Sequence, residues 1–143
     1  MSNSVLKYYY KNIIKQDLIT KFNYENAYEI PALKKIVINF GVTHSTLRNL
    51  LPSLAALLLV SSQKPYMVAS KTNIRLKVKG GVAIGCKINL RGKEKDLFLE
   101  KLVVYILPRL KNLRYVVADT NVFLKVDNLF LFKELEKEYD YFN

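Results

Sequence analysis

Two segments of alternating side chains constrain the fold of this chain more than any other feature. From Leu33 to Phe40, isoleucine and phenylalanine alternate with lysine, valine and asparagine, and Gly41 follows. From Val82 to Leu90, aliphatic residues and Cys86 alternate with small, amide and lysine side chains. A period of two is typical of a half-buried β-strand, because successive side chains point to opposite faces of the sheet. We therefore predict two strands that each cover a core with one face and leave the other face open.

The open faces of both predicted strands belong to a basic block. Between Ile30 and Lys93 the sequence has no Asp or Glu, yet it holds eleven of the 23 Lys and Arg residues. The 12 basic residues outside the block are balanced by the 12 acidic residues of the chain, so the formal net charge of +11 arises in the block. Such an asymmetry indicates a polyanionic partner, and a solvated basic surface without a ligand is the alternative.

Three other segments have the periodicity of amphipathic helices. The first helix is expected from residue 4 to about residue 22, the second from 47 to 60, and the third between Gly92 and Pro108. Pro52 either lies in the first turn of the second helix or kinks it. Helices of this kind, packed on the apolar faces of the two strands, predict an α+β domain.

The C-terminal part of the chain is expected to add strands. We predict strands at 116–118, 122–126 and 129–132, followed by an acidic and aromatic tail from Glu134 to Phe142. An apolar strand at 129–132 would be an exposed edge, which proteins rarely leave bare. We therefore expect another protein to cover that edge, with the tail in contact with protein because its acidic charge suits a polyanion poorly.

A short strand is also predicted at Tyr66–Ala69, after Pro65, and a basic arm from Ser70 to Gly81 connects it to the strand at Val82–Leu90. The aliphatic residues of this segment alternate with cations, and it ends on Gly80-Gly81, so we predict an extended and mobile arm. The cations of the basic arm are Lys71, Arg75, Lys77 and Lys79.

Catalysis, metal binding and membrane insertion find little support. The only histidine, His44, stands alone in a polar turn, without the partners of a nucleophilic site. Gly80-Gly81 matches no phosphate-binding loop. Cys86 is the only cysteine, so it forms no internal disulfide or thiolate metal site, and we expect it to pack as a small apolar residue. The longest apolar run is too short to span a bilayer.

Several ordered motifs resemble one family, the bacterial-type ribosomal protein five of the large subunit. The motifs are Pro31–Val42, Ser62–Pro65, Gly81–Gly92, Phe98–Arg114 with its Pro-Arg step, and the opening segment 8–24. They follow one another at the family's spacing and cover nearly the whole chain.

The resemblance implies an α+β fold in which an antiparallel sheet carries helices packed on one face, within a single domain of residues 1–143. It implies a structural constituent of the central protuberance of the large ribosomal subunit, which is not an enzyme and needs no cofactor. The implied partners are rRNA (5S rRNA or its replacement), P-site tRNA, neighbouring large-subunit proteins and a protein of the small-subunit head. A membrane or a small-molecule substrate is not expected. A free-standing basic RNA-binding or RNA-chaperone module is the alternative.

The resemblance also implies two sets of contact residues. The rRNA-binding candidates are Asn39, Gly41, Gln63, Lys64, Lys87, Asn89 and Arg91. The candidates for contact with tRNA or with the small subunit are the four cations of the basic arm, Lys71, Arg75, Lys77 and Lys79.

This sequence departs from the family pattern at two places. Asn89 stands where the family usually has a hydroxyl residue, and the family continues beyond the equivalent of 129–132 through a further strand and helix, so the chain resembles a C-terminally truncated member. The truncation, the lack of a clear presequence and a composition typical of an AT-rich genome favour a protein encoded and made in a mitochondrion. A bacterial cytoplasm is the alternative location.

Overall fold

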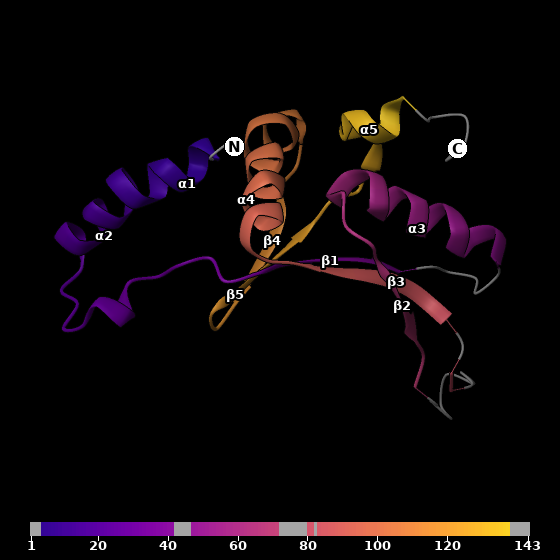
Figure 1. Ribbon diagram of the computed structural model, residues 1–143, viewed down its shortest axis with the longest axis horizontal. Coiled ribbons are helices and arrows are strands. Elements are labelled where there is room, and N and C mark those ends of the chain that lie inside the picture. The colour runs from indigo at the N-terminus through magenta and orange to yellow at the C-terminus, as the bar shows by residue number, and fades with distance from the viewer. Residues whose placement is uncertain (1–3, 42–46, 72–79, 82, 138–143) are drawn as a thin grey trace.

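The computed structural model describes residues 4–41, 47–71, 80–81 and 83–137 of the 143-residue chain. His44 and three cations of the basic arm, Arg75, Lys77 and Lys79, lie outside the described residues. Within the described part the fold is α+β, and the helices lie along one side of a three-stranded antiparallel sheet (Figure 1). The fold class predicted from the sequence is confirmed.

The sheet has the strand order β1-β3-β2. The central strand is β3 (Ala83–Leu90), and it pairs antiparallel with both β1 (Ile36–Gly41) and β2 (Tyr66–Ala69). All three strands were predicted, although β1 begins later than the predicted Leu33. The strand that is most regular in its sequence alternation therefore lies in the middle of the sheet.

The predicted alternation holds along β1 and most of β3. Cys86, Ile88 and Leu90 are buried, and the apolar side chains of β1 pack against them. Ile84 was also predicted to face the core, but its side chain is 42% exposed. The reason is an irregularity in the pairing with β2, where Val68 pairs with Gly85 and the next residue pairs with Ala83, which leaves Ile84 without a partner in β2.

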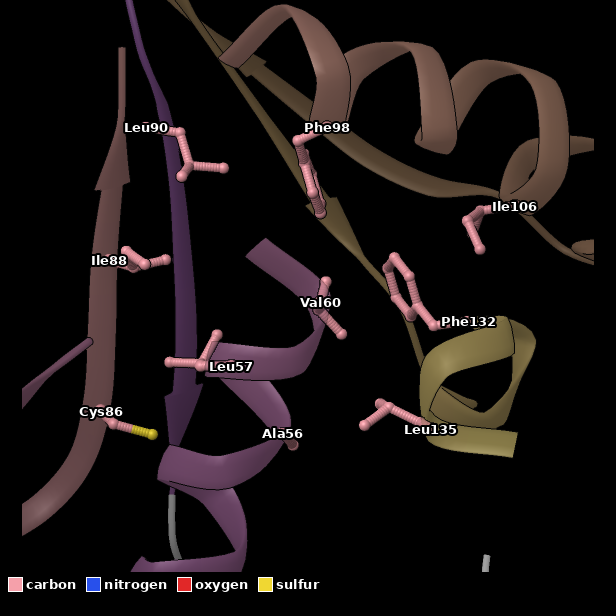
Figure 2. Close-up of a cluster of buried hydrophobic side chains, with 10 residues drawn as sticks. All are labelled: Ala56, Leu57, Val60, Cys86, Ile88, Leu90, Phe98, Ile106, Phe132 and Leu135. Carbon is pink, nitrogen blue, oxygen red and sulfur yellow. The ribbon is translucent and has the colours of Figure 1, made fainter. Parts of the chain in front are cut away.

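Helix α3 (Leu47–Ser61) covers the apolar face of the sheet and supplies Ala56, Leu57 and Val60 to the core shown in Figure 2. Pro52 lies inside this helix rather than in its first turn. Proline has no backbone N–H, so the helix lacks one interior hydrogen bond at that position.

A second helical segment completes this layer. It consists of α4 (Gly92–Lys101), a π-helical turn (Leu102–Ile106) and a 3₁₀ turn (Leu107–Arg109) that ends the segment at Pro108 as predicted. Phe98 and Ile106 point into the core, whereas the predicted core residues Leu97 and Tyr105 are largely exposed. Tyr105 lies within the π-helical turn, where the widened helix departs from the period of 3.6 residues on which the prediction was based.

The N-terminal helix is continuous, as predicted, but has three parts. These are α1 (Val5–Tyr9), a π-helical turn (Tyr10–Ile14) and α2 (Lys15–Lys21), and a short 3₁₀ turn (Ala27–Glu29) follows. Ser4 occupies the N-cap position, but its Oγ donates to Glu100 Oε2 at 3.1 Å and does not cap the helix. This hydrogen bond ties the start of the N-terminal helix to α4.

The C-terminal strands form a separate hairpin. β4 (Arg114–Ala118) pairs antiparallel with β5 (Asn121–Lys125), in agreement with the two strands predicted there. Every residue of both strands is exposed, including apolar ones such as Val116 and Phe123.

The prediction of a strand at 129–132 was wrong. The segment forms a 3₁₀ turn (Leu129–Leu131), and α5 (Lys133–Glu136) follows it directly. Asn128 Oδ1 accepts the backbone N–H of Phe130 at 3.0 Å, which turns the chain away from an extended path.

The same segment is also not an exposed edge. Phe132 is 5% exposed and Leu135 is 1% exposed, and the Phe132 ring stacks on that of Phe98 with the centroids 6.1 Å apart. Figure 2 shows both side chains closing the core. The hypothesis that another protein must cover an apolar edge at 129–132 therefore loses its basis. Glu134, at the start of the predicted tail, pairs with Lys101 instead, at 2.6 Å.

Candidate nucleic-acid interface

The face of the sheet that points away from the helices carries most of the predicted rRNA-binding residues. We call it the open face, and it comprises the described residues of the three strands whose side chains alternate with the core: Val37, Asn39, Gly41, Tyr66, Val68, Ala83, Gly85, Lys87 and Asn89. Pairing between strands arranges them in rows. One row is Asn39–Lys87–Tyr66, and a second is Gly41–Gly85–Val68.

Lys87 lies at the centre of the open face. Its side chain is half-buried between Asn39 of β1 and Tyr66 of β2, its direct partners across the sheet. The three strands contain no Asp or Glu. The ion pairs found in the described part of the chain join Lys95, Lys101 and Lys125 to acids outside the open face. The ammonium group of Lys87 makes no ion pair among the described residues and is therefore available to an external anion.

The flat end of the open face is formed by two paired glycines, Gly41 and Gly85. A Cβ atom on Gly85 would lie 2.2 Å from the carbonyl oxygen of Phe40, so only glycine fits there. A Cβ on Gly41 would meet nothing within 4 Å. The close approach of the backbone therefore requires glycine at Gly85, which is buried, while Gly41 is exposed and leaves a surface without a side chain.

Two amide side chains predicted to contact RNA are engaged within the protein. Gln63, in the loop after α3, donates from Nε2 to the carbonyl oxygen of Asn89 at 3.3 Å and so fixes that loop to β3. Asn89 donates from Nδ2 to the hydroxyl of Tyr66 at 3.3 Å, while its Oδ1 is buried and has no hydrogen-bond partner in the described structure. Gln63 therefore positions Asn89 and the neighbouring loop.

The remaining predicted residues lie at the border of the open face or beyond it. Lys64 is exposed in the loop that leads into β2, and Arg91 is exposed at the N-cap of α4, directly after β3. Lys71 is exposed just after β2, at the start of the basic arm. The structure thus brings Asn39, Lys87 and Asn89 together and places Lys64 and Arg91 on neighbouring segments.

Tyr66 is a residue of the open face that the sequence did not identify as a contact residue. From the sequence we expected no aromatic pair of the kind that stacks bases in RRM domains, and the open face has a single aromatic residue. Its strand is only four residues long, and the sequence alone does not show which of its faces points outward. The sequence indicated only that Tyr66 and Val68 share one face of the strand, opposite Met67 and Ala69.

The structure offers no support for a metal centre or a membrane span. Within the described ranges, no three His, Cys, Asp or Glu side chains gather in a way that could hold a metal ion. None of the described helices combines the length and the apolar character needed to cross a bilayer. Cys86 is buried among aliphatic side chains as predicted, and burial raises the pKa of its thiol.

Comparison with known proteins shows clear relatives, although no family model matches the chain. The sequence is 34% identical to "Large ribosomal subunit protein uL5m" of Reclinomonas americana over 96% of this chain and 80% of that protein. It is 35% identical to "Large ribosomal subunit protein uL5" of Pediococcus pentosaceus, over 92% of this chain and 77% of the relative. The uL5 protein of Buchnera aphidicola from Baizongia pistaciae is 37% identical over 74% of this chain, and the match spans 61% of that relative, which is less than two thirds of its length.

These relatives agree with the resemblance inferred from the motifs, and the identity to the Reclinomonas protein extends over most of both chains. The chain therefore belongs to the uL5 family of large ribosomal subunit proteins.

Proposed function

We propose that this protein is a structural constituent of the large ribosomal subunit and that its open face binds rRNA. The observation that carries the proposal is an acid-free sheet face with Lys87 at its centre, in a chain that is 34–37% identical to large ribosomal subunit proteins. The role is structural rather than catalytic, in keeping with the names of these relatives.

The chemistry of the open face suits a folded RNA. Lysine and arginine neutralise phosphates, while asparagine can bond to ribose hydroxyls and base edges. Gly41, which is exposed and has no side chain, leaves room for a phosphate backbone to approach the sheet closely. In this proposal Asn39, Lys87 and Asn89 contact rRNA directly, Gly41 leaves space, and Gln63 holds the adjacent loop. Lys64 and Arg91 add phosphate contacts at the border.

The partner of the open face is proposed to be 5S rRNA or the RNA that replaces it, with neighbouring large-subunit proteins beside it. The resemblance to the family supports this choice. The relatives are mitochondrial and bacterial, and the composition typical of an AT-rich genome favours the mitochondrion as the location, with a bacterial cytoplasm as the alternative.

The basic arm is proposed to have a separate partner, the P-site tRNA or a protein of the small-subunit head. Its cations are Lys71, Arg75, Lys77 and Lys79. The sequence predicts an extended and mobile arm for these cations, so we expect Lys77→Ala with Lys79→Ala to incorporate normally into large subunits but to weaken tRNA retention or subunit joining. Failure of this double variant to assemble would assign the basic arm to rRNA instead.

Sedimentation of the native protein through a gradient of high ionic strength tests the function. A ribosomal constituent stays with large subunits, whereas a free-standing RNA-binding protein remains at the top of the gradient. Binding to isolated rRNA should also weaken with salt. If about seven cations touch phosphates, the logarithm of the binding constant should fall with the logarithm of salt concentration at a slope of about −5 to −6. An affinity that is independent of salt would contradict an RNA interface.

A further inference from the structure

Tyr66 is the only aromatic residue on the open face of the described sheet, and it is exposed there because no helix covers that face of its edge strand. Its side chain is 46% exposed at the centre of a basic surface, directly opposite Lys87. Exposed aromatic rings beside cations are the elements with which proteins hold unstacked nucleic-acid bases.

The hydrogen bond to Asn89 anchors the Tyr66 hydroxyl. Asn89 is two residues further along β3 than Lys87, the direct partner of Tyr66, so the hydroxyl reaches a diagonal neighbour. Diagonal neighbours in an antiparallel sheet are about 7–8 Å apart, and a tyrosine that stood upright on the sheet would carry its hydroxyl past the short asparagine side chain. The hydrogen bond therefore ties the Tyr66 hydroxyl to a diagonal neighbour, while the residue remains 46% exposed.

Among the described residues, no cation or aromatic ring is found stacked over the Tyr66 ring. The cation–π contacts among the described residues are Lys21 with Phe22 and Lys133 with Tyr105, so Lys87 lies beside the Tyr66 ring rather than over it. The aromatic pairs in the same part of the chain are Phe22 with Tyr24 and Phe98 with Phe132. The ring thus has an anchored hydroxyl and no stacking partner among the described residues.

The hydroxyl group of Tyr66 can still donate a hydrogen bond. Tyr66 accepts the hydrogen bond from Asn89 Nδ2, and its own hydroxyl hydrogen has no acceptor among the described residues. It can therefore donate to an acceptor on a ligand that lies against the ring. A base edge or a ribose oxygen offers such an acceptor.

We propose that Tyr66 stacks on one unpaired base of the bound rRNA, while Lys87 neutralises a phosphate of the same segment. This inference rests on the proposed function, because it names the kind of RNA element that the open face takes. The element is a loop or bulge with an unstacked base, since the bases of a continuous duplex are not available for stacking.

The test compares three variants of the full-length protein in binding to deproteinised large-subunit rRNA. Tyr66→Leu should weaken binding by about tenfold while leaving the salt dependence unchanged, because stacking is not a charge interaction. Tyr66→Phe keeps the ring and should bind within about threefold of the wild type, since it loses only a neutral hydrogen bond. Lys87→Ala should weaken binding and make the salt slope shallower by about one phosphate contact.

The outcomes separate the inference from the proposed function. Wild-type binding by Tyr66→Leu, together with weakened binding by Lys87→Ala, would overturn the stacking role and leave the rRNA interface in place. Wild-type binding by both variants would overturn the interface itself.

Ultraviolet crosslinking of the wild-type complex gives a second measurement that needs no variant to fold. A crosslink between Tyr66 and an unpaired nucleotide is expected. Crosslinks elsewhere on the open face without one at Tyr66 would contradict the proposal.

Discussion

The two paired glycines of the open face differ in how strictly the structure requires glycine. Gly41 and Gly85 pair with each other and look equivalent in the sequence, yet only Gly85 is constrained by the backbone of its neighbour. A β-strand glycine is thus not necessarily a flexible position. Here the constraint is the closeness of the Phe40 carbonyl oxygen, which would lie 2.2 Å from an added Cβ.

Alanine at the two glycines should therefore have unequal effects. Gly85→Ala should lower the free energy of unfolding by about 1–3 kcal/mol, because β1 or β3 must shift to admit the methyl group. Gly41→Ala, the matched control, should change it by less than about 0.5 kcal/mol. Urea titration followed by circular dichroism measures both values. Equal effects of the two substitutions would show that the close contact is not maintained in solution.

The ion pair between Lys101 and Glu134 should make the stability of the fold depend on pH. Burial alone would raise the pKa of Glu134, but the hydrogen bond from Lys101 and the charges of Lys101 and Lys137 hold the pKa below its ordinary value. Lys101 also donates to the carbonyl oxygen of Val60 at 3.1 Å, so the ammonium group links α3, α4 and α5.

The pair should stabilise the fold only while Glu134 is ionised. Because its pKa is lower in the folded state, the contribution is complete above the unfolded pKa and is lost as the pH falls through the folded value. Wild type should exceed Glu134→Gln in unfolding free energy at about pH 6, by less than about 1 kcal/mol for this partly exposed pair, and the difference should be smaller at about pH 3. A difference of equal size at both pH values would mean that the carboxylate charge is not responsible.

At the scale of elements, the two C-terminal segments differ in burial. The hairpin of β4 and β5 is exposed on all its residues, whereas the turn and short helix that follow close the core. The buried contacts of Phe132 and Leu135 therefore decide how strongly the C-terminal segment is attached.

Two phenylalanines in these segments form a matched pair for a stability experiment. Phe132→Ala should reduce the free energy of unfolding by about 3–5 kcal/mol, because it opens a cavity beside Phe98. Phe123, on β5, is 59% exposed, so Phe123→Ala should cost less than about 1 kcal/mol. Thermal or urea unfolding of both variants measures the difference. A larger loss from Phe123→Ala would mean that the hairpin, and not the segment around Phe132, packs against the core.

The sequence correctly predicted the strands whose alternating pattern extends over many residues. It failed for a short segment whose conformation depends on a turn and on tertiary packing. β1 and β3 were identified because their alternation runs over many residues and fixes which face is buried. The segment 129–132 was assigned wrongly because a short apolar run fits a strand and a buried turn equally well. The turn at Asn128 and the space beside Phe98 settle the choice, and the space arises only from tertiary packing.

The same distinction applies to the candidate site. Asn39, Lys87 and Asn89 could be grouped from the sequence, because they lie on the regular strands. The role of Gln63 in holding Asn89 depends on where the loop after α3 docks, and the position of Tyr66 depends on the register of an edge strand with an irregularity. Neither the docking nor the register is encoded in a periodic pattern.

At the scale of the whole molecule, the fold separates a core side from a charged side. The helices cover one face of the sheet, and the open face presents Lys87 with cations at its border. The strands of the acid-free block thereby present its Lys87 on one side of the molecule, whereas α3, which belongs to the same block, lies on the other side. The central claim is that the open face, rather than positive charge in general, positions the protein on rRNA.

Incorporation into large subunits by charge-matched double variants tests this claim most directly. Lys87→Ala with Arg91→Ala removes two cations at the open face, and Lys133→Ala with Lys137→Ala removes two exposed cations on and after α5, in the helix layer. Each variant competes with tagged wild-type protein during assembly, and the ratio in purified large subunits is measured by mass spectrometry. A lost charged contact in a preformed site costs about 1.5–3 kcal/mol, so the open-face variant should be outcompeted by at least tenfold. The control variant should incorporate within about twofold of the wild type. Equal incorporation of the two variants would contradict the account.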